Sequence, residues 1–130
     1  FIMQLYETIY IVKQDLDSAS IKAVEEKYEN LLKLKKATIE YTENWGLRNL
    51  AYKIKNYKKG YYFMLVFNSD IEALNELERN FRIDENIIRF LTTKIENVPI
   101  EPSFIMKAKI EKENSETMLN EEKLVSNEGQ

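Results

Sequence analysis

The sequence of 130 residues contains no cysteine and no histidine. Their absence excludes disulfide bonds, thiolate nucleophiles, zinc sites with the usual ligands and every catalytic triad that needs histidine. The chain has only 3 glycines and 2 prolines, and none of the glycines belongs to a loop that would cradle a phosphate through backbone amides. We therefore expect no enzyme: no catalytic residue, no metal site, no cofactor and no small-molecule substrate.

Long hydrophobic runs are missing as well. No stretch approaches the roughly 20 apolar residues that span a bilayer, and no charged segment followed by a long apolar one indicates a secretory signal. We expect a cytoplasmic protein with no membrane partner. No arginine-rich, acid-poor transit segment is visible, so an organelle is the less favoured location.

One segment lacks negative charge entirely, although the chain has a net charge of -3. No acidic residue occurs between Glu43 and Asp70. The segment instead carries five basic residues, Arg48, Lys53, Lys55, Lys58 and Lys59, interleaved with aromatic ones that include Trp45, Tyr52, Tyr57, Tyr61 and Tyr62. A positive, aromatic-rich surface of this kind is typical of proteins that meet a phosphate backbone.

Length and charge predict one domain with a tail. A chain of this size with 44% hydrophobic residues closes one core. Residues 1–96 carry 15 basic and 15 acidic side chains, whereas residues 97–130 carry 4 and 7. We expect a neutral globular domain over 1–96 and an acidic, disordered tail over 97–130.

Hydrophobic patterning predicts the order of the elements. Residues 5–12 are β-branched and aromatic, which favours a strand. A helix follows, capped by Asp17 or Ser18 and ending near Lys36, and a capping box of Ser69 and Glu72 starts a second helix. The expected apolar faces of the two helices are Ile21, Val24, Tyr28, Leu31 and Leu32 in the first, and Ile71, Leu74, Leu77 and Phe81 in the second.

Three further segments read as extended: 37–45 and 48–55, then 61–67, with a polar turn over residues 56–60. Residues 87–95 make a last strand. The order β-α-β-β-α-β predicts an α+β, ferredoxin-like domain, with two helices on one face of a four-stranded antiparallel sheet. The first strand is apolar in both registers, so the second face of the sheet must also be covered, by loops, by self-association or by a partner.

Three separated blocks carry a resemblance to a known family. They are Trp45 to Ile54, Lys59 to Tyr62 and Arg79 to Leu91, and the opening Leu5-Tyr6-Glu7 agrees with them. Over residues 5–95 the chain resembles the bacterial small-subunit ribosomal protein S6 family. The resemblance implies the same fold and a structural, RNA-binding role in translation without catalysis. It also implies a heterodimer with ribosomal protein S18 that binds small-subunit (16S-type) rRNA and aids assembly of the central domain, or platform, of the subunit.

The residues themselves suggest where RNA would bind. A guanidinium at Arg48 can bond a phosphate or stack on a base, with a salt bridge to Glu43 or another strand carboxylate as the alternative. The hairpin lysines suit sequence-independent phosphate contacts, or are simply solvated. Arg89 and Lys94, which we place in one register of the last strand, are expected to contact RNA or the partner. The predicted RNA-binding set is Arg48, Lys53, Lys55, Lys58, Lys59, Arg89 and Lys94.

Two other features keep alternatives open. Trp45 beside Gly46 favours a packing anchor at a strand bend over a base-stacking role. In the tail, Phe104, Ile105, Met106 and Ile110 are predicted to bind a partner, or else to be incidental hydrophobes. The alternative function is a ferredoxin-like small-molecule-binding module or acyl-phosphate enzyme. Glu7 is either a strand-edge partner for a basic residue or a general base, and since no second acid, metal ligand or nucleophile is grouped near it, the structural role is favoured.

Overall fold

The computed structural model describes residues 2–99, 102–103 and 106. The chain divides into two units, residues 1–99 and residues 100–130. The described part of the first unit forms β1 (Gln4–Lys13), α1 (Ser18–Leu34), β2 (Thr38–Ile54), β3 (Tyr57–Ser69), α2 (Ile71–Ile83) and β4 (Ile87–Lys94). No helix within the described ranges is long and apolar enough to cross a membrane.

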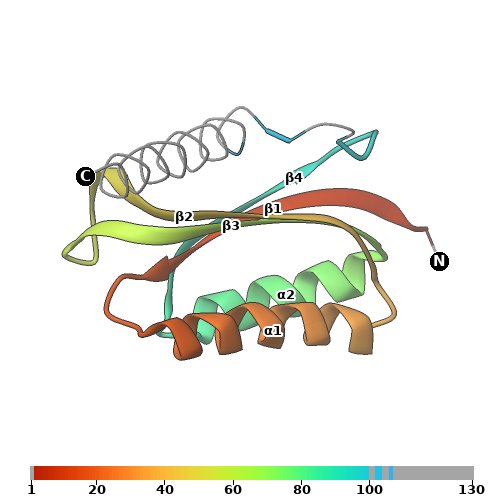
Figure 1. Cartoon of the computed structure of the whole chain (residues 1–130). Coiled ribbons are helices and arrows are strands. Elements are labelled where there is room, and N and C mark those ends of the chain that lie inside the picture. Colours follow the sequence, from red (N-terminus) through yellow and green to blue (C-terminus); the bar gives the residue numbers. More distant parts are fainter. Residues whose placement is uncertain (1, 100–101, 104–105, 107–130) are drawn as a thin grey trace, which may run out of the picture. The chain divides into compact units, whose positions relative to one another are not determined.

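The four strands form one sheet in the order β2-β3-β1-β4, and every neighbouring pair is antiparallel. Helices α1 and α2 lie side by side against one face of this sheet (Figure 1). The predicted ferredoxin-like β-α-β-β-α-β fold is therefore confirmed. We call the face of the sheet that carries no helix the second face.

Alternation along β1 distributes its side chains between the two faces. Tyr6, Tyr10 and Val12 belong to the core cluster that packs against the helices. Their neighbours in the chain, including Ile9 and Ile11, point to the second face. Pairing places Ile9 between Met64 of β3 and Leu91 of β4, so the second face has an apolar centre.

Helix α1 follows its prediction. The side chain of Asp17 caps it by accepting a hydrogen bond from the N–H of Ser20 at 3.0 Å. Val24, Tyr28 and Leu32 are buried, and Ile21 and Leu31 pack against the same core. The periodic apolar positions thus form one stripe on the side of the helix that meets the sheet.

The start of helix α2 differs from the expected capping box. Asp70 is the cap, and its side chain accepts from the N–H of Ala73 at 2.9 Å. Ser69 is instead the buried last residue of β3, and its hydroxyl donates to the carbonyl of Asp70 at 2.9 Å. The prediction was wrong by one residue because the strand continues through Ser69.

The buried face of α2 is formed by Ala73, Leu74, Leu77 and Phe81. Ile71, which the sequence placed on this face, is 56% exposed. At about 100° of rotation per residue, Ala73 lies closer than Ile71 to the direction that Leu74, Leu77 and Phe81 share. The prediction for Ile71 was therefore wrong.

Aromatic rings join the helices to the sheet. The Phe81 ring lies 5.1 Å from that of Tyr10, 4.5 Å from Tyr28 and 5.1 Å from Phe90, measured between centroids. Tyr10 also stacks on Phe63 at 5.3 Å. Phe81 thus connects α2 with α1, β1 and β4.

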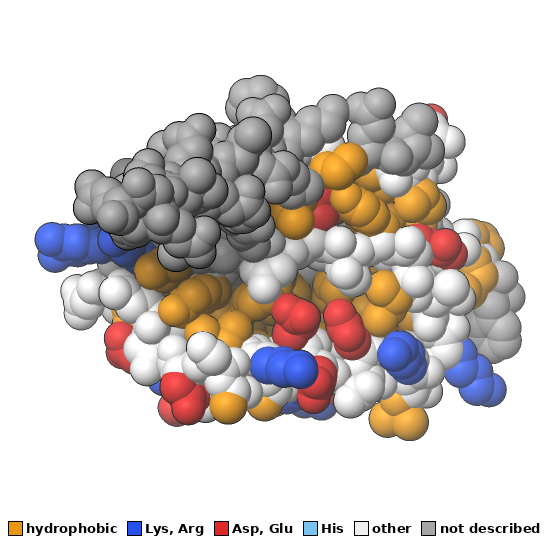
Figure 2. Space-filling view, viewed as in Figure 1, with side chains coloured by type: hydrophobic (Ala, Val, Ile, Leu, Met, Phe, Trp, Pro, Cys, Tyr) orange, Lys and Arg blue, Asp and Glu red, His pale blue; other side chains and the backbone are white. Residues whose placement is uncertain are grey.

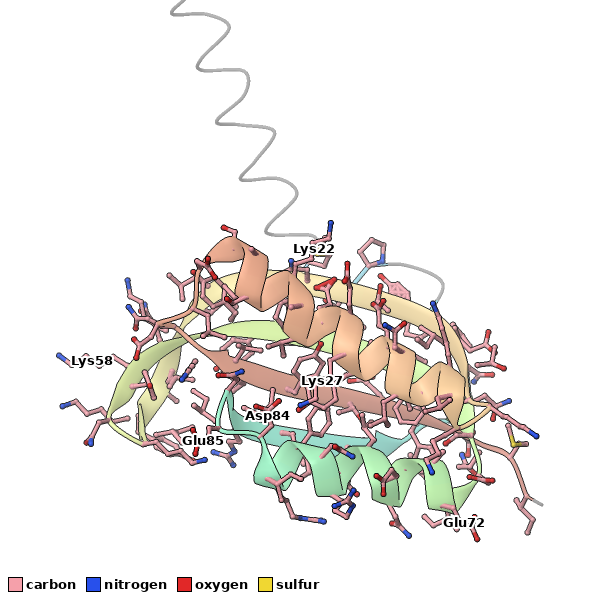
Figure 3. All side chains as sticks on the ribbon, turned by 90° about the horizontal axis from the view of Figure 1, so that it is seen from below. Lys22, Lys27, Lys58, Glu72, Asp84 and Glu85 are labelled. Carbon is pink, nitrogen blue, oxygen red and sulfur yellow. The ribbon has the colours of Figure 1, made fainter. Side chains whose placement is uncertain are left out.

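A polar tie closes one end of this core. Asp84, which ends α2, accepts hydrogen bonds from the hydroxyl of Tyr28 at 2.5 Å and from the ammonium of Lys27 at 3.1 Å. Figure 3 shows Lys27 and Asp84 between the two helices. Burial raises the pKa of the Asp84 carboxyl, but hydrogen bonds from Tyr28, Asn86 and Lys27 outweigh burial, and the net pKa is lowered.

Strand β2 is longer than predicted. The extended segments 37–45 and 48–55 belong to one strand, Thr38–Ile54. The turn is not the polar stretch 56–60, because Tyr57, Lys59 and Gly60 already belong to β3 and pair with β2. It consists of Lys55 and Asn56, with φ values of 50° and 69°. Two positive φ values in a two-residue loop are typical of a type I′ hairpin turn, whose twist suits the flanking strands.

Candidate nucleic-acid interface

The hairpin of β2 and β3 ends in a group of exposed cations. Lys53, Lys55, Lys58 and Lys59 are all exposed. Lys and Arg side chains gather at the end of the molecule that this hairpin forms (Figure 2), and Lys58 points outward from it (Figure 3). The structure thus brings four of the seven predicted RNA-binding residues together on one projecting element.

Arg48 lies on β2 at the base of the same group. It pairs with Gly60 of β3, and its side chain is exposed. Together with Leu47, Asn49 and Lys59 it lines a shallow hollow of about 340 Å³. Among the described residues Arg48 has no ion pair with a carboxylate, so the alternative salt bridge to Glu43 is not formed there. Its planar guanidinium remains a suitable ligand for a phosphate.

A break in pairing bends the hairpin. Along the hairpin, Asn49 of β2 pairs with Lys59 of β3, and the following pair is Ile54 with Tyr57. Four residues of β2 therefore lie opposite the single residue Lys58 of β3. Extra residues in one strand bend that strand and increase its twist. We call residues 48–60 the hairpin arm.

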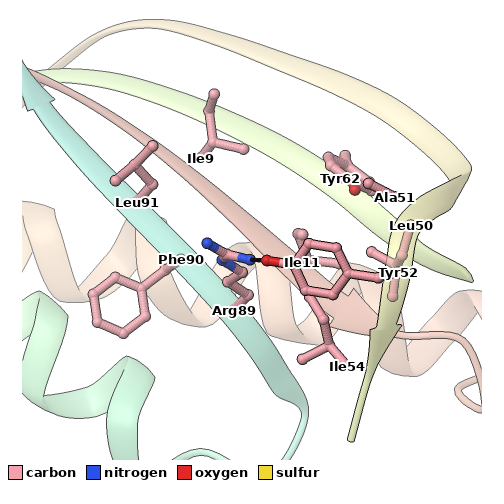
Figure 4. A pocket seen from close by; sticks show the side chains of 10 residues that line it. All are labelled: Ile9, Ile11, Leu50, Ala51, Tyr52, Ile54, Tyr62, Arg89, Phe90 and Leu91. Carbon is pink, nitrogen blue, oxygen red and sulfur yellow. Dashed lines mark hydrogen bonds between the residues drawn. The ribbon is translucent and has the colours of Figure 1, made fainter. Parts of the chain in front are cut away.

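The bend brings the arm across the second face to the opposite edge of the sheet. There the guanidinium of Arg89 on β4 donates from Nη1 to the hydroxyl of Tyr52 at 2.6 Å. The same guanidinium lies 5.9 Å from the centre of the Tyr52 ring. This contact lies beside an open cavity of about 240 Å³. Figure 4 shows the side chains that line the cavity, which come mainly from β1, β4 and the arm and include Ile11, Leu50 and Leu91.

The two predicted site residues on β4 lie on opposite faces of the sheet. Arg89 pairs with Ile11 and Lys94 with Tyr6, with regular pairing between them. Ile11 faces the second face and Tyr6 faces the helices, so Arg89 and Lys94 point to opposite sides of the sheet. Placing them in one register was wrong, because positions five apart in a strand alternate to opposite faces. Lys94 is exposed beside Ile71 and Glu72 at the start of α2, away from the hairpin arm.

Trp45 is a packing residue. Its side chain is buried, its Nε1 donates to Glu43 at 2.7 Å, and its ring stacks on Tyr62 at 6.1 Å. Tyr41 donates to the other oxygen of Glu43 at 2.5 Å, and burial together with this bond raises the pKa of Tyr41 to about 12. The register shifts between Asn44 and Gly46, so Trp45 is the extra residue of the bulge, and Gly46, with φ of 76°, follows it. The packing role of Trp45 and the bulge at Gly46 are confirmed.

The predicted partner-binding residues lie in the second unit. Phe104, Ile105 and Ile110 lie outside the described residues. Met106 is described: it is helical and half-buried, and its N–H donates to the hydroxyl of Ser103 at 3.1 Å. The partner-binding role of all four stays a prediction.

Tyr52 is the site residue that sequence reasoning missed. It stood out only as one aromatic among several in the acid-free segment, and its partner Arg89 lies 37 residues further along the chain. No local pattern pairs two such positions. Within the described ranges, no group of three or more Asp or Glu side chains is arranged to hold a metal ion.

The architecture defines a ferredoxin-like domain with a basic hairpin arm, and a solved structure shares its fold. The crystal structure of 30S ribosomal protein S6 from Thermotoga maritima aligns with a TM-score of 0.69 at 24% sequence identity, covering 90% of this chain and 99% of the other. That likeness supports the fold.

Sequence comparison identifies the family. The family model described as Ribosomal protein S6 matches residues 5–94. Among curated relatives, small ribosomal subunit protein bS6 of Rickettsia bellii is 42% identical over 105 residues, covering 81% of this chain and 88% of that protein. The bS6 protein of Hyphomonas neptunium is 39% identical over 107 residues, covering 82% and 96%. The chain belongs to the ribosomal protein S6 family, which is structural and non-enzymatic, so the prediction that it is no enzyme is confirmed.

Proposed function

We propose that this chain is a structural constituent of the small ribosomal subunit that binds small-subunit rRNA together with ribosomal protein S18 and aids assembly of the central domain. Its place of action is the cytoplasmic ribosome. The relatives from Rickettsia and Hyphomonas are small-subunit proteins of bacteria, and the family membership supports the same role for this chain.

The observation that carries the RNA-binding part is the charge of the hairpin arm. The arm holds Arg48 and four exposed lysines, and no acidic residue occurs between Glu43 and Asp70. Ammonium groups on a projecting hairpin neutralise phosphates without reading sequence, and counterion release then makes binding depend on salt. Arg89 on the second face and Lys94 on the helix side are further candidate contacts for RNA or partner.

We propose that tight RNA binding requires S18 because the domain itself offers few cations to the RNA. The domain of residues 1–96 is neutral overall, so it lacks the large positive field that drives tight binding to RNA alone. A basic partner supplies additional phosphate contacts. The tail residues Phe104, Ile105, Met106 and Ile110 are the proposed contacts with that partner, on the strength of their apolar character in an otherwise polar segment.

The test measures retention of a central-domain fragment of small-subunit rRNA by the purified chain over a salt series, with and without S18. We expect tight binding only, or mainly, when S18 is present. Replacing Lys55, Lys58 and Lys59 together with Gln then weakens binding and lowers the steepness of the salt dependence by about 1 to 3, since each phosphate contact contributes about 0.9.

The matched control replaces Lys22, Lys33 and Lys36 with Gln. These lysines are exposed on and just after α1, so the net charge changes equally while the arm stays intact. Neither triple variant is expected to lower the melting temperature much, because exposed lysines contribute little to stability. Negligible RNA retention in low salt with S18 present would remove the proposed function, and equal effects of the two triple variants would remove the arm from the interface.

A further inference from the structure

We propose that Arg89 and Tyr52 form a latch that holds the hairpin arm in the orientation in which its cations meet RNA, so that Arg89 is a positioning residue. This inference rests on the proposed function for its consequence in RNA binding. The latch itself is a property of the free protein and is tested separately.

The arm needs contacts with the rest of the domain to fix its orientation, because the pairing between β2 and β3 is interrupted within it. Between Asn49 and Ile54, β2 has three residues more than the facing stretch of β3. Residues 50–53 therefore lack a regular ladder of hydrogen bonds to β3. A segment of this kind has low local stability unless other contacts fix it.

The structure supplies two ties on different sides of the arm. Tyr52 accepts the 2.6 Å hydrogen bond from Arg89 on β4. The hydroxyl of Tyr57 donates to the carboxylate of Asp15, in the loop after β1, at 3.0 Å. These two contacts determine the direction of the turn residues Lys55 and Asn56 between them.

The Arg89 contact is the one that crosses the sheet. Strands β2 and β4 are its two outer strands, and the latch joins them over the second face (Figure 4). A charged donor shortens and strengthens such a hydrogen bond, and the guanidinium adds an attraction to the face of the ring. Tyr52 is 62% exposed, so water competes for the contact and the arm can be released.

The experiment compares Tyr52→Phe, Arg89→Lys and Arg89→Gln with the wild type, each with its tail intact. Tyr52→Phe removes the acceptor without changing charge. Arg89→Lys keeps the charge but loses the planar donor that fits the ring. Lys58→Gln is the control, because it removes one charge from the arm and leaves the latch untouched.

Amide hydrogen exchange of the free protein reports on the latch. We expect faster exchange at the paired residues of the arm, Asn49, Ile54, Tyr57 and Lys59, in all three latch variants, with β1 and α1 unchanged, and no such change in Lys58→Gln. Wild-type exchange at these four residues in Tyr52→Phe and Arg89→Gln would overturn the proposal, whatever the RNA results.

RNA retention with S18 present then separates positioning from direct contact. For a latch, Tyr52→Phe and Arg89→Lys each weaken binding by roughly three- to tenfold without altering the salt dependence. The double variant Tyr52→Phe with Arg89→Lys binds RNA as tightly as the weaker-binding of the two single variants, because each substitution removes the same Arg89–Tyr52 interaction. Should Tyr52→Phe bind like wild type while Arg89→Gln lowers the salt dependence by about 1, Arg89 contacts phosphate directly and the positioning role is wrong. No binding by the wild type would instead refute the proposed function.

Discussion

Replacing Phe81 with Ala tests how much of the fold depends on the aromatic core. Phe81 is 1% exposed, and its ring contacts rings from β1, α1 and β4. Truncating a buried Phe to Ala costs about 3 to 5 kcal/mol, since transfer energy is lost and a cavity remains. Because rings surround Phe81 on several elements, no single neighbour can fill the space, and we expect about 4 to 5 kcal/mol.

This loss is large against the whole stability of the domain. Domains of this size are stable by about 5 to 15 kcal/mol, so the variant remains folded at room temperature unless the wild type lies at the low end. Each kcal/mol lowers the Tm of such a domain by about 4 to 8 °C. The expected fall in Tm is therefore about 15 to 40 °C.

Urea unfolding followed by far-UV circular dichroism measures the free energy, and Trp45, the single tryptophan, gives a second signal by fluorescence. Ile71→Ala is the matched control, since it removes an aliphatic side chain that is 56% exposed from the same helix and is expected to cost less than about 1 kcal/mol. A loss below about 1.5 kcal/mol for Phe81→Ala, or equal losses in the two variants, would refute the assignment of Phe81 to the centre of the core.

Three further outcomes follow from local geometry. In Gly60→Ala the added methyl group would clash with Cγ2 of the buried Ile11 side chain, and we expect a loss of about 1 to 3 kcal/mol in the free energy of unfolding. A urea-unfolding midpoint equal to that of the wild type would contradict this. Gly46→Ala, at φ of 76°, is expected to cost about 1 to 2 kcal/mol, measured by Tm. Asp84→Asn is expected to cost about 1 to 3 kcal/mol at neutral pH. Because the folded pKa of Asp84 is lowered, its contribution is present above the ordinary Asp pKa of about 3.9 and is lost as the pH falls through the lower folded value. The stabilities of the wild type and Asp84→Asn should therefore begin to approach each other below about pH 4 and become equal only below the folded pKa of Asp84, and a difference that stays constant with pH would argue against the charged contact.

Much of the fold could be predicted because its signals are local. The apolar stripe of α1 and the alternation in β1 place Tyr10, Tyr28 and Leu32 in the core without reference to any distant residue. The outward position of Ile71 is less sharply set by local geometry, because rotation of about 100° per residue brings Ala73 only slightly closer than Ile71 to the buried face of α2. The opposite directions of Arg89 and Lys94 do follow from local spacing, since an odd separation along a strand sets two side chains on opposite faces.

The hairpin shows where local signals fail. Asn56 and Gly60 both favour turns, and the sequence alone does not say which of them the chain uses. The turn falls at Lys55 and Asn56 because cross-strand pairing continues to Ile54 and Tyr57. Gly60 has a different purpose, which is to let β3 pass close to Ile11 on β1.

The amino-acid sequence by itself determined the order of the elements, the composition of the core and the positive charge of the segment between Glu43 and Asp70, because each depends on residue type and short-range spacing. Tertiary structure alone decided that the hairpin arm bends over the second face and that Tyr52 meets Arg89. That outcome depends on how many residues of β2 lie opposite β3, a quantity set by pairing between strands, and on the sheet order that makes β4 the far edge.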